Sequence, residues 1–482
     1  MPGRRSASSR MRSFRARPAF SGMIALTLAL TTGCSQVGDY QRPSSYLPEK
    51  WQQGEPAEGT RKASQTDWRT LFQDPRLQVL IATALLHNND LKIALARVEE
   101  TRAQYDITSA DRLPSANLSG TRSKSKIPAI FTGTDQPVTT QRTELSLTAV
   151  SFELDFWGRV ANLSEAARSS FLASESASRA MRIALISEVA NLYFTQLELE
   201  ERTAISRAAI NSRKKNRDLV KRGMELGAAA RSDVLLAEGA LHSAQGELAV
   251  LQNQQASTEH SLRLLVGKPL DEMPPGKKLH EQDVRNDLAP GIPSEVLYAR
   301  PDVIASENRL KEAHANIGVA RAAFLPKILL TAAVGLASPM LAGLFAPGTG
   351  NWSFQPAFSL PLFDGGRSAG FVDVAEARKN SAVADYERTI QQAFREVADL
   401  LSSRASLAEQ RQATESIVRA YEERLIVVEA RFKSGSASFL EVLDAQRDLF
   451  AQKQAAVQIR RAQLTAAAQL YKALGGGDAP EA

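Results

Sequence analysis

The sequence predicts a mainly α-helical chain with a small β component, built from one structural unit that occurs twice. Ala, Leu, Gln, Glu and Arg dominate long stretches, and aromatic residues are 6% of the 482 residues, a composition typical of long helices. Two stretches of roughly 65 residues contain no proline, so each can form one uninterrupted helix. Segments with alternating apolar and polar residues precede them, and this alternation is typical of β-strands.

Internal repetition supports the two-copy organisation. At an offset of 212 residues the chain repeats Asp90, Arg97, Glu100 and Pro114 as Asp302, Arg309, Glu312 and Pro326. At an offset of 208 it repeats Gly158-Arg159, Gly227 and Val234-Leu235 as Gly366-Arg367, Gly435 and Val442-Leu443. We therefore expect two copies of one unit, at 80–267 and 294–475, with a slightly longer middle loop in the first.

The excess of positive charge is confined to the beginning of the chain. Residues 1–33 hold six arginines and no acidic residue, and without them 53 basic residues balance 53 acidic ones. A nucleic-acid-binding protein needs basic residues clustered on its working domain, so we expect no nucleic-acid partner. The single cysteine excludes an intrachain disulfide and a Cys-based zinc site, and no apolar run reaches the ~18 residues of a membrane helix.

Residues 1–33 have the three parts of an export signal. An arginine-rich region is followed by the apolar run 23–30, which is too short to span a bilayer. The sequence Thr31-Thr32-Gly33-Cys34 resembles a bacterial lipoprotein cleavage site, although Leu30 lies one position earlier than that pattern prefers. The resemblance implies a signal peptide at 1–33, a covalent lipid on Cys34 and, from Ser35 in second position, sorting to the outer membrane. An unlipidated export signal is the alternative.

Each copy begins with a predicted helix of about 33 residues, 80–112 or 294–324, that ends before Pro114 or Pro326. Alternation with a period of two then predicts strands at 114–127, 142–156, 326–338 and 351–363. An apolar face opposite a polar face is typical of strands between lipid and water, and a half-buried soluble hairpin is the alternative. The alternation slips at Ala149-Val150, which predicts a β-bulge.

After the second strand of each copy, the long helix runs to a glycine turn, near Gly227 in the first copy and near Gly435 in the second. A further helix of about 35 residues completes the copy. The remaining parts of the chain are an N-terminal segment at 34–79, an equatorial linker at 268–293 and a C-terminal tail at 476–482.

Four strands per chain cannot close a barrel by themselves. An open sheet edge in lipid leaves backbone polar groups unsatisfied, at several kcal/mol each. Three chains supply twelve strands, enough to enclose a water-filled pore. The sequence therefore predicts a homotrimer in which a 12-stranded transmembrane β-barrel continues into a tube of helical hairpins.

Six stretches of sequence, in their order and spacing, resemble one family: Asp39-Tyr40-Gln41-Arg42-Pro43, Leu71-Phe72-Gln73-Asp74-Pro75, Ala299-Arg300-Pro301-Asp302-Val303, Phe363-Asp364-Gly365-Gly366-Arg367, Val442-Leu443-Asp444-Ala445-Gln446 and Tyr471-Lys472-Ala473-Leu474-Gly475-Gly476-Gly477. The chain is similar over residues 34–477 to the TolC-like outer-membrane efflux proteins, in particular the lipoprotein branch that includes OprM and NodT. At Gly38-Asp39 it lacks a proline that the family often has between them. The resemblance implies a trimeric β-barrel in the outer membrane on a long periplasmic α-helical barrel. It also implies a periplasmic adaptor protein and an inner-membrane transporter of the RND type as partners.

The resemblance also implies an aperture at the periplasmic end. In the family, acidic residues six and nine places after the second tip glycine line the narrowest opening, and here these are Glu441 and Asp444. Glu441 also forms an S-x-x-E capping box with Ser438, so helix capping is its alternative role. Asp444 shares a helix face with Leu440, and threefold symmetry would place an apolar ring beside an acidic ring that favours cations. A solvated carboxylate is the alternative for Asp444, and the first copy has Leu236 at the matching position.

The turn residues Arg222, Gly223, Gly227 and Gly435 are candidate contacts for the adaptor. The alternative is a plain helical turn, which by itself accounts for Gly227 and Gly435 because glycine accepts a positive φ. Both interpretations are compatible at these two positions.

Other classes of protein fit the sequence less well. An enzyme would need a nucleophile with a base, a metal cluster or a phosphate-binding loop, and none is present, so we expect no catalysis, no metal and no cofactor other than the lipid. A coiled-coil periplasmic scaffold explains the helices but not the strands, and a porin has many more strands per chain. We expect a passive conduit for small molecules that depends on a partner for energy; a channel for type I secretion or ABC-type efflux is the alternative.

Overall fold

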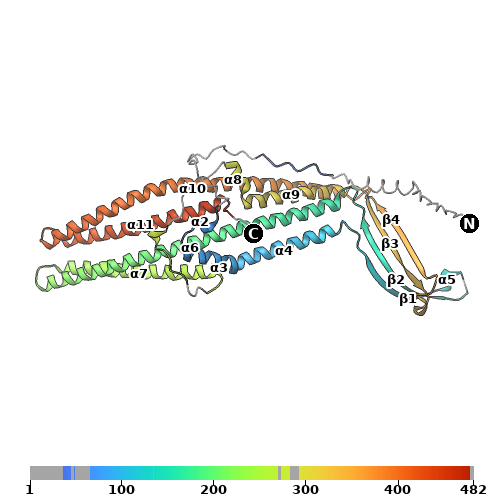
Figure 1. Ribbon diagram of the computed structural model, residues 1–482, viewed down its shortest axis with the longest axis horizontal. Coiled ribbons are helices and arrows are strands. Elements are labelled where there is room, and N and C mark those ends of the chain that lie inside the picture. The colour runs from blue at the N-terminus through green and yellow to red at the C-terminus, as the bar shows by residue number, and fades with distance from the viewer. Residues whose placement is uncertain are drawn as a thin grey trace, which may run out of the picture. The chain divides into compact units, whose positions relative to one another are not determined.

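The computed structural model describes residues 36–44, 48, 66–133, 135–269, 273–282 and 293–477 (Figure 1). The expected signal peptide at 1–33, Cys34 and much of the segment 34–79 lie outside the described residues, as do parts of the linker and of the C-terminal tail. The chain divides into two compact units. Unit 1 comprises residues 1–41, 103–169 and 311–380, and unit 2 comprises residues 42–102, 170–310 and 381–482.

The structure is helix-rich with one small antiparallel sheet, as the sequence predicts. Its helices are α2 (Trp68–Leu71), α3 (Pro75–His87), α4 (Asn89–Ala110), α5 (Ala129–Thr132), α6 (Arg159–Glu225), α7 (Arg231–Val266), η2 (Leu279–Glu281), α8 (Pro293–Ala299), α9 (Pro301–Ala322), η3 (Leu341–Gly343), α10 (Arg367–Lys433) and α11 (Phe439–Ala473). Its strands are β1 (Asn117–Ile127), β2 (Val138–Glu153), β3 (Lys327–Ser338) and β4 (Gly350–Ser359). Among the described helices, none is both long and apolar enough to cross a bilayer.

Corresponding helices of the two copies have nearly equal lengths. Helices α6 and α10 have 67 residues each, α4 and α9 have 22 each, and α7 and α11 have 36 and 35. At ~1.5 Å per residue, α6 and α10 are each about 100 Å long. The two halves of the sequence therefore form the same succession of elements.

The first helix of each copy is broken, which corrects the prediction of continuous helices at 80–112 and 294–324. The breaks lie at Asn88, between α3 and α4, and at Arg300, between α8 and α9. Asn88 begins a new helix because its Oδ1 accepts a hydrogen bond from the Leu91 N–H at 2.8 Å. Arg300 precedes Pro301, which disfavours a helical conformation at the residue before it.

The residue at each break also binds the end of the last helix of its copy. Asn88 Nδ2 donates to the Leu265 carbonyl at 2.8 Å, and Arg300 Nη1 donates to the Ala473 carbonyl at 2.7 Å. The two donors are 212 residues apart and the two acceptors 208, the same offsets that relate the copies. Carbonyls at the C-terminal ends of α7 and α11, which lack partners within the helix, are thereby satisfied.

The largest fully buried side chains belong to unit 2, where short helices and the linker pack against the long ones. The ring of Phe72 lies 6.3 Å from that of Phe194 and 6.5 Å from that of Tyr471. Beside them Asp74, which is 1% exposed, accepts hydrogen bonds from the Tyr193 hydroxyl at 2.7 Å and from the Lys277 N–H at 3.0 Å. Asp74 therefore joins α3, α6 and the linker, and a buried carboxylate needs such donors.

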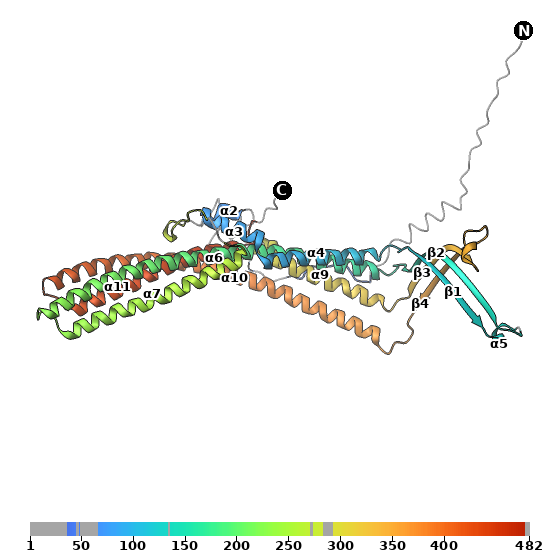
Figure 2. The ribbon, with the colours of Figure 1, turned by 90° about the horizontal axis from the view of Figure 1, so that it is seen from below.

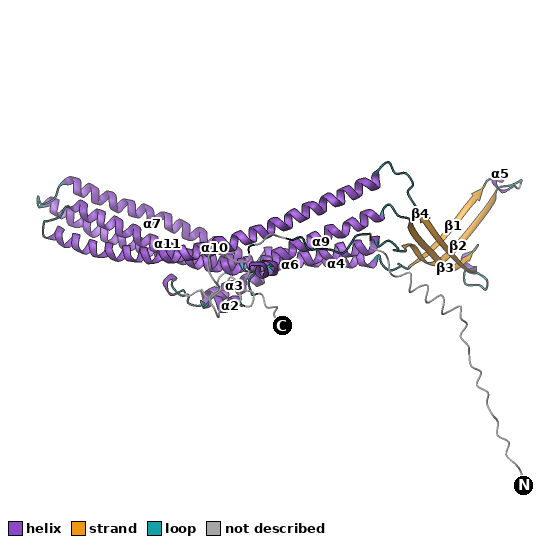
Figure 3. Ribbon diagram, turned by 90° about the horizontal axis from the view of Figure 1, so that it is seen from above, coloured by secondary structure: helices purple, strands orange, loops and turns teal. Residues whose placement is uncertain are grey.

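The four strands of unit 1 form an antiparallel sheet in the order β1-β2-β3-β4 (Figure 3). The register shifts between Ala149 and Phe152 of β2, which confirms the predicted bulge, and Ser151 there has a positive φ of 50°. Strand β2 begins at Val138 rather than at 142, because the pairing with β1 extends to Ile127↔Val138. Strand β4 ends at Ser359 rather than at 363, just before Pro361, which has no N–H to donate.

The register gives the sheet two chemically different faces. Directly paired residues share a face. The face that we call the apolar face carries Leu118, Leu145, Leu147, Ala149, Phe152, Ile328, Leu330, Ala332, Val334, Leu336, Trp352, Phe354 and Phe358, and toward the β1–β2 hairpin it continues with Arg122, Lys124, Lys126, Thr139, Gln141 and Thr143. The polar face carries Asn117, Ser119, Thr121, Ser123, Ser125, Thr140, Arg142, Glu144, Ser146, Thr148, Asn351, Ser353, Gln355 and Ser359. Trp352 and Phe358 each remain 79% exposed, so no described residue covers the apolar face there.

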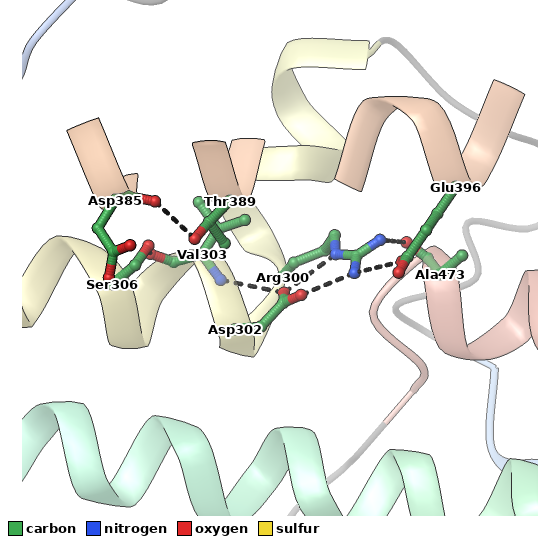
Figure 4. A network of polar contacts seen from close by, with 8 residues as sticks. All are labelled: Arg300, Asp302, Val303, Ser306, Asp385, Thr389, Glu396 and Ala473. Atoms are coloured by element: carbon green, nitrogen blue, oxygen red, sulfur yellow. Dashed lines mark hydrogen bonds and ion pairs between the residues drawn. The ribbon is translucent and has the colours of Figure 1, made fainter. Parts of the chain in front are cut away.

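A network of polar contacts surrounds the break at Arg300 (Figure 4). The Arg300 side chain is 5% exposed, and its Nη2 lies 2.7 Å from Asp302 Oδ2 and 2.9 Å from Glu396 Oε2. Burial acts to raise the pKa of Asp302, but the hydrogen bonds and charge of Arg300 outweigh it and hold that pKa below its ordinary value. The folded chain therefore takes up a proton at Asp302 less readily than the unfolded chain does.

We expect acid to weaken this network. The stability that Asp302 contributes is complete above its unfolded pKa of about 4 and is lost as the pH falls through the lower folded pKa. The difference in unfolding free energy between the wild type and Asp302→Asn, measured by denaturant titration in detergent, should narrow from about pH 5 to about pH 2. Asp399→Asn removes a carboxylate that is 75% exposed and should follow the wild-type curve. A constant difference would contradict the prediction.

Candidate functional site

The hairpins α6–α7 and α10–α11 end in turns with the same backbone geometry. Gly227 has φ of 74° and Gly435 has φ of 77°. In the first turn the Ala228 N–H donates to the Gly223 carbonyl at 2.7 Å, and in the second the Ser436 N–H donates to the Arg431 carbonyl at 2.9 Å. This pattern is the Schellman C-cap, which requires a left-handed residue. Both turns lie at the same end of unit 2 (Figures 1 and 2).

An apolar cluster joins the two hairpins just behind their turns. Its buried members come from all four helices and are Val220, Val234, Ala237, Val428, Phe439 and Val442. The rings of Phe432 and Phe439 lie 5.7 Å apart beside it. The two turns of one chain therefore form one packed tip, which we call the hairpin tip.

Glu441 lies in the first turn of α11 and caps that helix. Its Oε1 accepts from the Ser438 N–H at 3.0 Å, while the Glu441 N–H donates to Ser438 Oγ at 3.3 Å, so the predicted capping box is confirmed. These contacts, together with the charge of Arg431 at 3.4 Å, hold the pKa of Glu441 below its ordinary value, the Ser438 N–H having the largest effect. Glu441 is thus engaged in local structure and stays ionised.

Asp444 lies one turn further along, on an exposed face of α11. Leu440, four residues before it, is 54% exposed, and the Asp444 side chain is 39% exposed. Asp444 Oδ1 lies 3.1 Å from Arg447 Nη1, and Arg447 also contacts Asp448 at 3.1 Å. The apolar and acidic positions expected to face an opening therefore lie side by side, but each Asp444 has a cation beside it.

The first copy repeats the shape of this site but lacks the charge that corresponds to Asp444. Asp233, which matches Glu441, accepts from the Ala230 N–H at 3.3 Å, and Ala230 has no side-chain oxygen to return a bond. Leu236 replaces Asp444 and is 46% exposed. Leu226, in the turn itself, is 85% exposed. The first hairpin therefore presents apolar side chains where the second presents a charged pair.

Leu440, Glu441 and Asp444 lie next to one another on α11, as the sequence predicts, whereas the contacts of Arg447 and Arg431 with this site were not predicted. Arg447 is three residues after Asp444, within reach on one helix face, and this spacing could have revealed the pair. Arg431 contacts Glu441 across the turn, a contact that depends on the turn geometry rather than on helical spacing. Arg222 and Gly223 lie beside the first turn, where a Cβ on Gly223 would come within 3.3 Å of Ala229 Cβ.

The hairpin tip contains carboxylates and arginines but no catalytic arrangement of a nucleophile with a base. Within the described residues, no group of His, Cys, Asp and Glu side chains is arranged to hold a metal ion. The geometry at this end offers surfaces for contact and charges that can influence ions.

Known proteins similar to this chain share one description. The sequence profile of the family described as outer membrane efflux protein matches residues 80–268 and 292–476. The toluene efflux pump outer membrane protein TtgC of Pseudomonas putida is 38% identical over 460 residues, covering 94% of this chain and 95% of that protein. The cation efflux system protein CusC of Escherichia coli K12 is 37% identical over 455 residues, covering 94% and 98%.

Solved structures agree with these sequence relationships. A membrane protein from Pseudomonas aeruginosa matches with a TM-score of 0.85 and 36% identity, covering 92% of this chain and all of that chain. The open state of the Neisseria gonorrhoeae MtrE outer membrane channel matches with a TM-score of 0.85 and 34% identity, covering 92% and 98%.

We expect Asp444→Ala to raise single-channel conductance and to weaken block by Mg²⁺ in planar bilayers. A carboxylate about 4 Å from a divalent cation in water contributes ~2 kcal/mol, twice the value for two unit charges, so the Mg²⁺ concentration for half-maximal block should rise about thirtyfold. Arg447→Gln removes the neighbouring cation and should have the opposite effect on block.

Asp385→Ala is the matched control, because Asp385 also pairs with an arginine three residues further along its helix and is exposed. It should conduct like the wild type. Unchanged block in Asp444→Ala would remove Asp444 from the opening.

Proposed function

Because the chain belongs to the outer membrane efflux protein family, we propose that three copies form a passive export conduit, with a 12-stranded β-barrel in the outer membrane and an α-helical barrel in the periplasm. The observation that carries this proposal is the four-stranded sheet with one apolar face and two unpaired edges, β1 and β4. The outer edge of each of these strands needs a partner in lipid, because unsatisfied backbone groups there cost several kcal/mol each.

The chemistry of the two faces supports lipid outside and water inside. Trp352 and Phe358 are exposed on the apolar face, and large exposed apolar patches mark an interaction surface. The polar face is lined by hydroxyl and amide groups, with Ser125 Oγ 2.8 Å from Thr140 Oγ1. Such a lining suits a water-filled pore. No element of this proposal supplies energy, so export depends on a partner.

We assign the aperture and the docking surface to the hairpin tip. Leu440 and Asp444 would form the constriction by threefold symmetry, and Glu441 supports it by capping α11. Arg222, Gly223, Gly227 and Gly435 mark the two turns, which would contact a periplasmic adaptor protein. The adaptor would connect the conduit to an inner-membrane transporter of the RND type, whose substrate binding selects the cargo.

The segment that follows Cys34 supports a lipid anchor on unit 1. The Gly38 carbonyl lies 2.8 Å from His314 Nε2, and the Tyr40 ring lies 5.9 Å from the His314 ring, edge to face. Arg321 Nη1 donates to the Gln36 carbonyl at 3.4 Å. These contacts hold Gln36, Gly38 and Tyr40, which follow Cys34 closely in the sequence, along α9.

Similarity alone does not single out a cargo. Relatives named for toluene efflux, as an antibiotic efflux pump and for cation efflux are 38%, 38% and 37% identical to this chain. We propose small molecules as the exported class, with no nucleic acid and no bound cofactor besides the lipid.

We expect a double variant, Ser119→Cys with Ser359→Cys, to form disulfides only between chains. A disulfide needs Cα atoms within about 7 Å, whereas three strand spacings of ~4.8 Å separate β1 from β4 within one chain. Non-reducing electrophoresis after oxidation should give a ladder that ends at three chains. Each single variant should remain at one chain, because equivalent positions on neighbouring chains of a closed trimer lie four strand spacings apart.

Native mass spectrometry of the wild type in detergent checks the same assembly without substitutions. A solitary protomer under every lipid condition, or a ladder that continues past three chains, would contradict the closed trimer.

We expect Cys34→Ser to abolish incorporation of labelled palmitate, because the cysteine thiol is the attachment point of the lipid in the lipoprotein pattern. Ser35→Ala leaves the thiol in place and should keep the label. Label that persists in Cys34→Ser would show that the anchor lies elsewhere or is absent.

A further inference from the structure

Three basic side chains follow one another on a single face of β1. Arg122, Lys124 and Lys126 occupy alternate positions, so all three point to the same side of the sheet. All three residues are exposed, and none has a hydrogen-bond or ion-pair partner among the described residues. We call this row the basic stripe.

The basic stripe lies on the apolar face, at the end of β1 nearer the β1–β2 hairpin. Leu118 precedes the stripe on the same face. The β2 residues paired with the three basic residues are Thr143, Gln141 and Thr139, which are polar and uncharged. On β2 and β3 the last apolar residues are Leu145 and Leu336, which are paired with each other and lie one row before the row of Arg122. The boundary between apolar and basic side chains is therefore sharp.

The height of the apolar face fits a membrane. Along β3 its positions run from Ile328 to Leu336, about 27 Å at ~3.4 Å per residue. This is close to the ~25 Å apolar band of outer-membrane barrels, somewhat reduced by the tilt of the strands. Arg122 lies one row beyond this band, ~7 Å further along the strand, where lipid head groups begin, and Lys124 and Lys126 follow ~7 Å and ~14 Å beyond Arg122.

No carboxylate on this face neutralises the basic stripe. Glu144 belongs to the polar face, where it pairs with Arg142 at 3.0 Å and accepts from Asn351 at 3.2 Å. Lysine on an edge strand can also prevent sheet-to-sheet aggregation. That role would call for charges on both edges, and β4, the other edge, carries none.

Resting on the proposed function, in which the apolar face contacts lipid, we propose that the basic stripe binds the phosphate groups of anionic lipids in the leaflet at the hairpin end of the sheet. Lys and Arg extend along apolar surface and keep their charge at the head-group level. Alternate residues lie ~7 Å apart along the strand, so adjacent cations can engage separate phosphates. Arg122 adds a guanidinium that matches a phosphate with two hydrogen bonds.

The test compares lipid retention by the full-length wild type and two variants. The stripe variant combines Arg122→Gln, Lys124→Gln and Lys126→Gln. The matched control combines Lys214→Gln, Lys215→Gln and Lys221→Gln, which removes the same charge from exposed positions of α6. Each protein is reconstituted with phosphatidylcholine and a minor fraction of phosphatidylglycerol, and native mass spectrometry counts the lipids that stay bound.

The wild type and the control should retain phosphatidylglycerol in preference to phosphatidylcholine. The stripe variant should lose at least about tenfold of that preference, since one basic residue near a membrane surface is worth about fivefold. The wild-type preference should also fall as salt rises. An equal preference in all three proteins would overturn the proposal, and so would displacement of the lipid by inorganic phosphate, which would assign the stripe to the free anion.

Single-channel recording of the same preparations separates this proposal from the proposed function. Trimers that conduct but show no lipid preference would overturn the lipid site alone. The absence of both trimers and conductance in the wild type would overturn the conduit itself.

Discussion

The unpaired outer edges of β1 and β4 are the constraint on which the rest of the structure depends. Backbone N–H and C=O groups in lipid have no water to bind, so a sheet there must close on itself. The described sheet has four strands and an exposed apolar face, so in the proposed conduit other copies would have to supply the closure. In the proposed trimer the long helices, the repeated hairpins and the tip would follow the same symmetry, because each chain would contribute an equal share of every layer.

The duplication preserves positions more strictly than chemistry. Asn88 and Arg300 occupy equivalent breaks and bind equivalent helix ends, yet one is an amide and the other a cation held by Asp302 and Glu396. At the tip both turns need glycine, but the position of Asp444 in the second copy is occupied by Leu236 in the first. Both copies need a capped helix end and a left-handed turn residue, so these features are the same in both. Side chains that serve neither purpose differ between the copies.

Much of this architecture could be read from sequence because its signals are periodic. The offsets of 212 and 208, the alternation along the strands and the slip near Ala149 all describe features that repeat or break a period. The break at Asn88 was missed because a single capping residue hardly changes the periodic pattern. The break at Arg300 had a signal in the sequence, because Pro301 disfavours a helical conformation at the residue before it. Arg431 was missed because its contact with Glu441 depends on the geometry of the turn, whereas Arg447 could have been found from its spacing of three residues from Asp444.

The equal length of α6 and α10 restricts how such a chain can change. Each extra residue in one of these helices would rotate everything beyond it by about 100° and advance it by ~1.5 Å. Val220 and Val428 would then leave the cluster that joins the two turns. Insertions and deletions in α6 or α10 should therefore be tolerated only when both helices change by the same number of residues, or when the change is close to a whole number of turns. The lengths of the two helices are thus coupled.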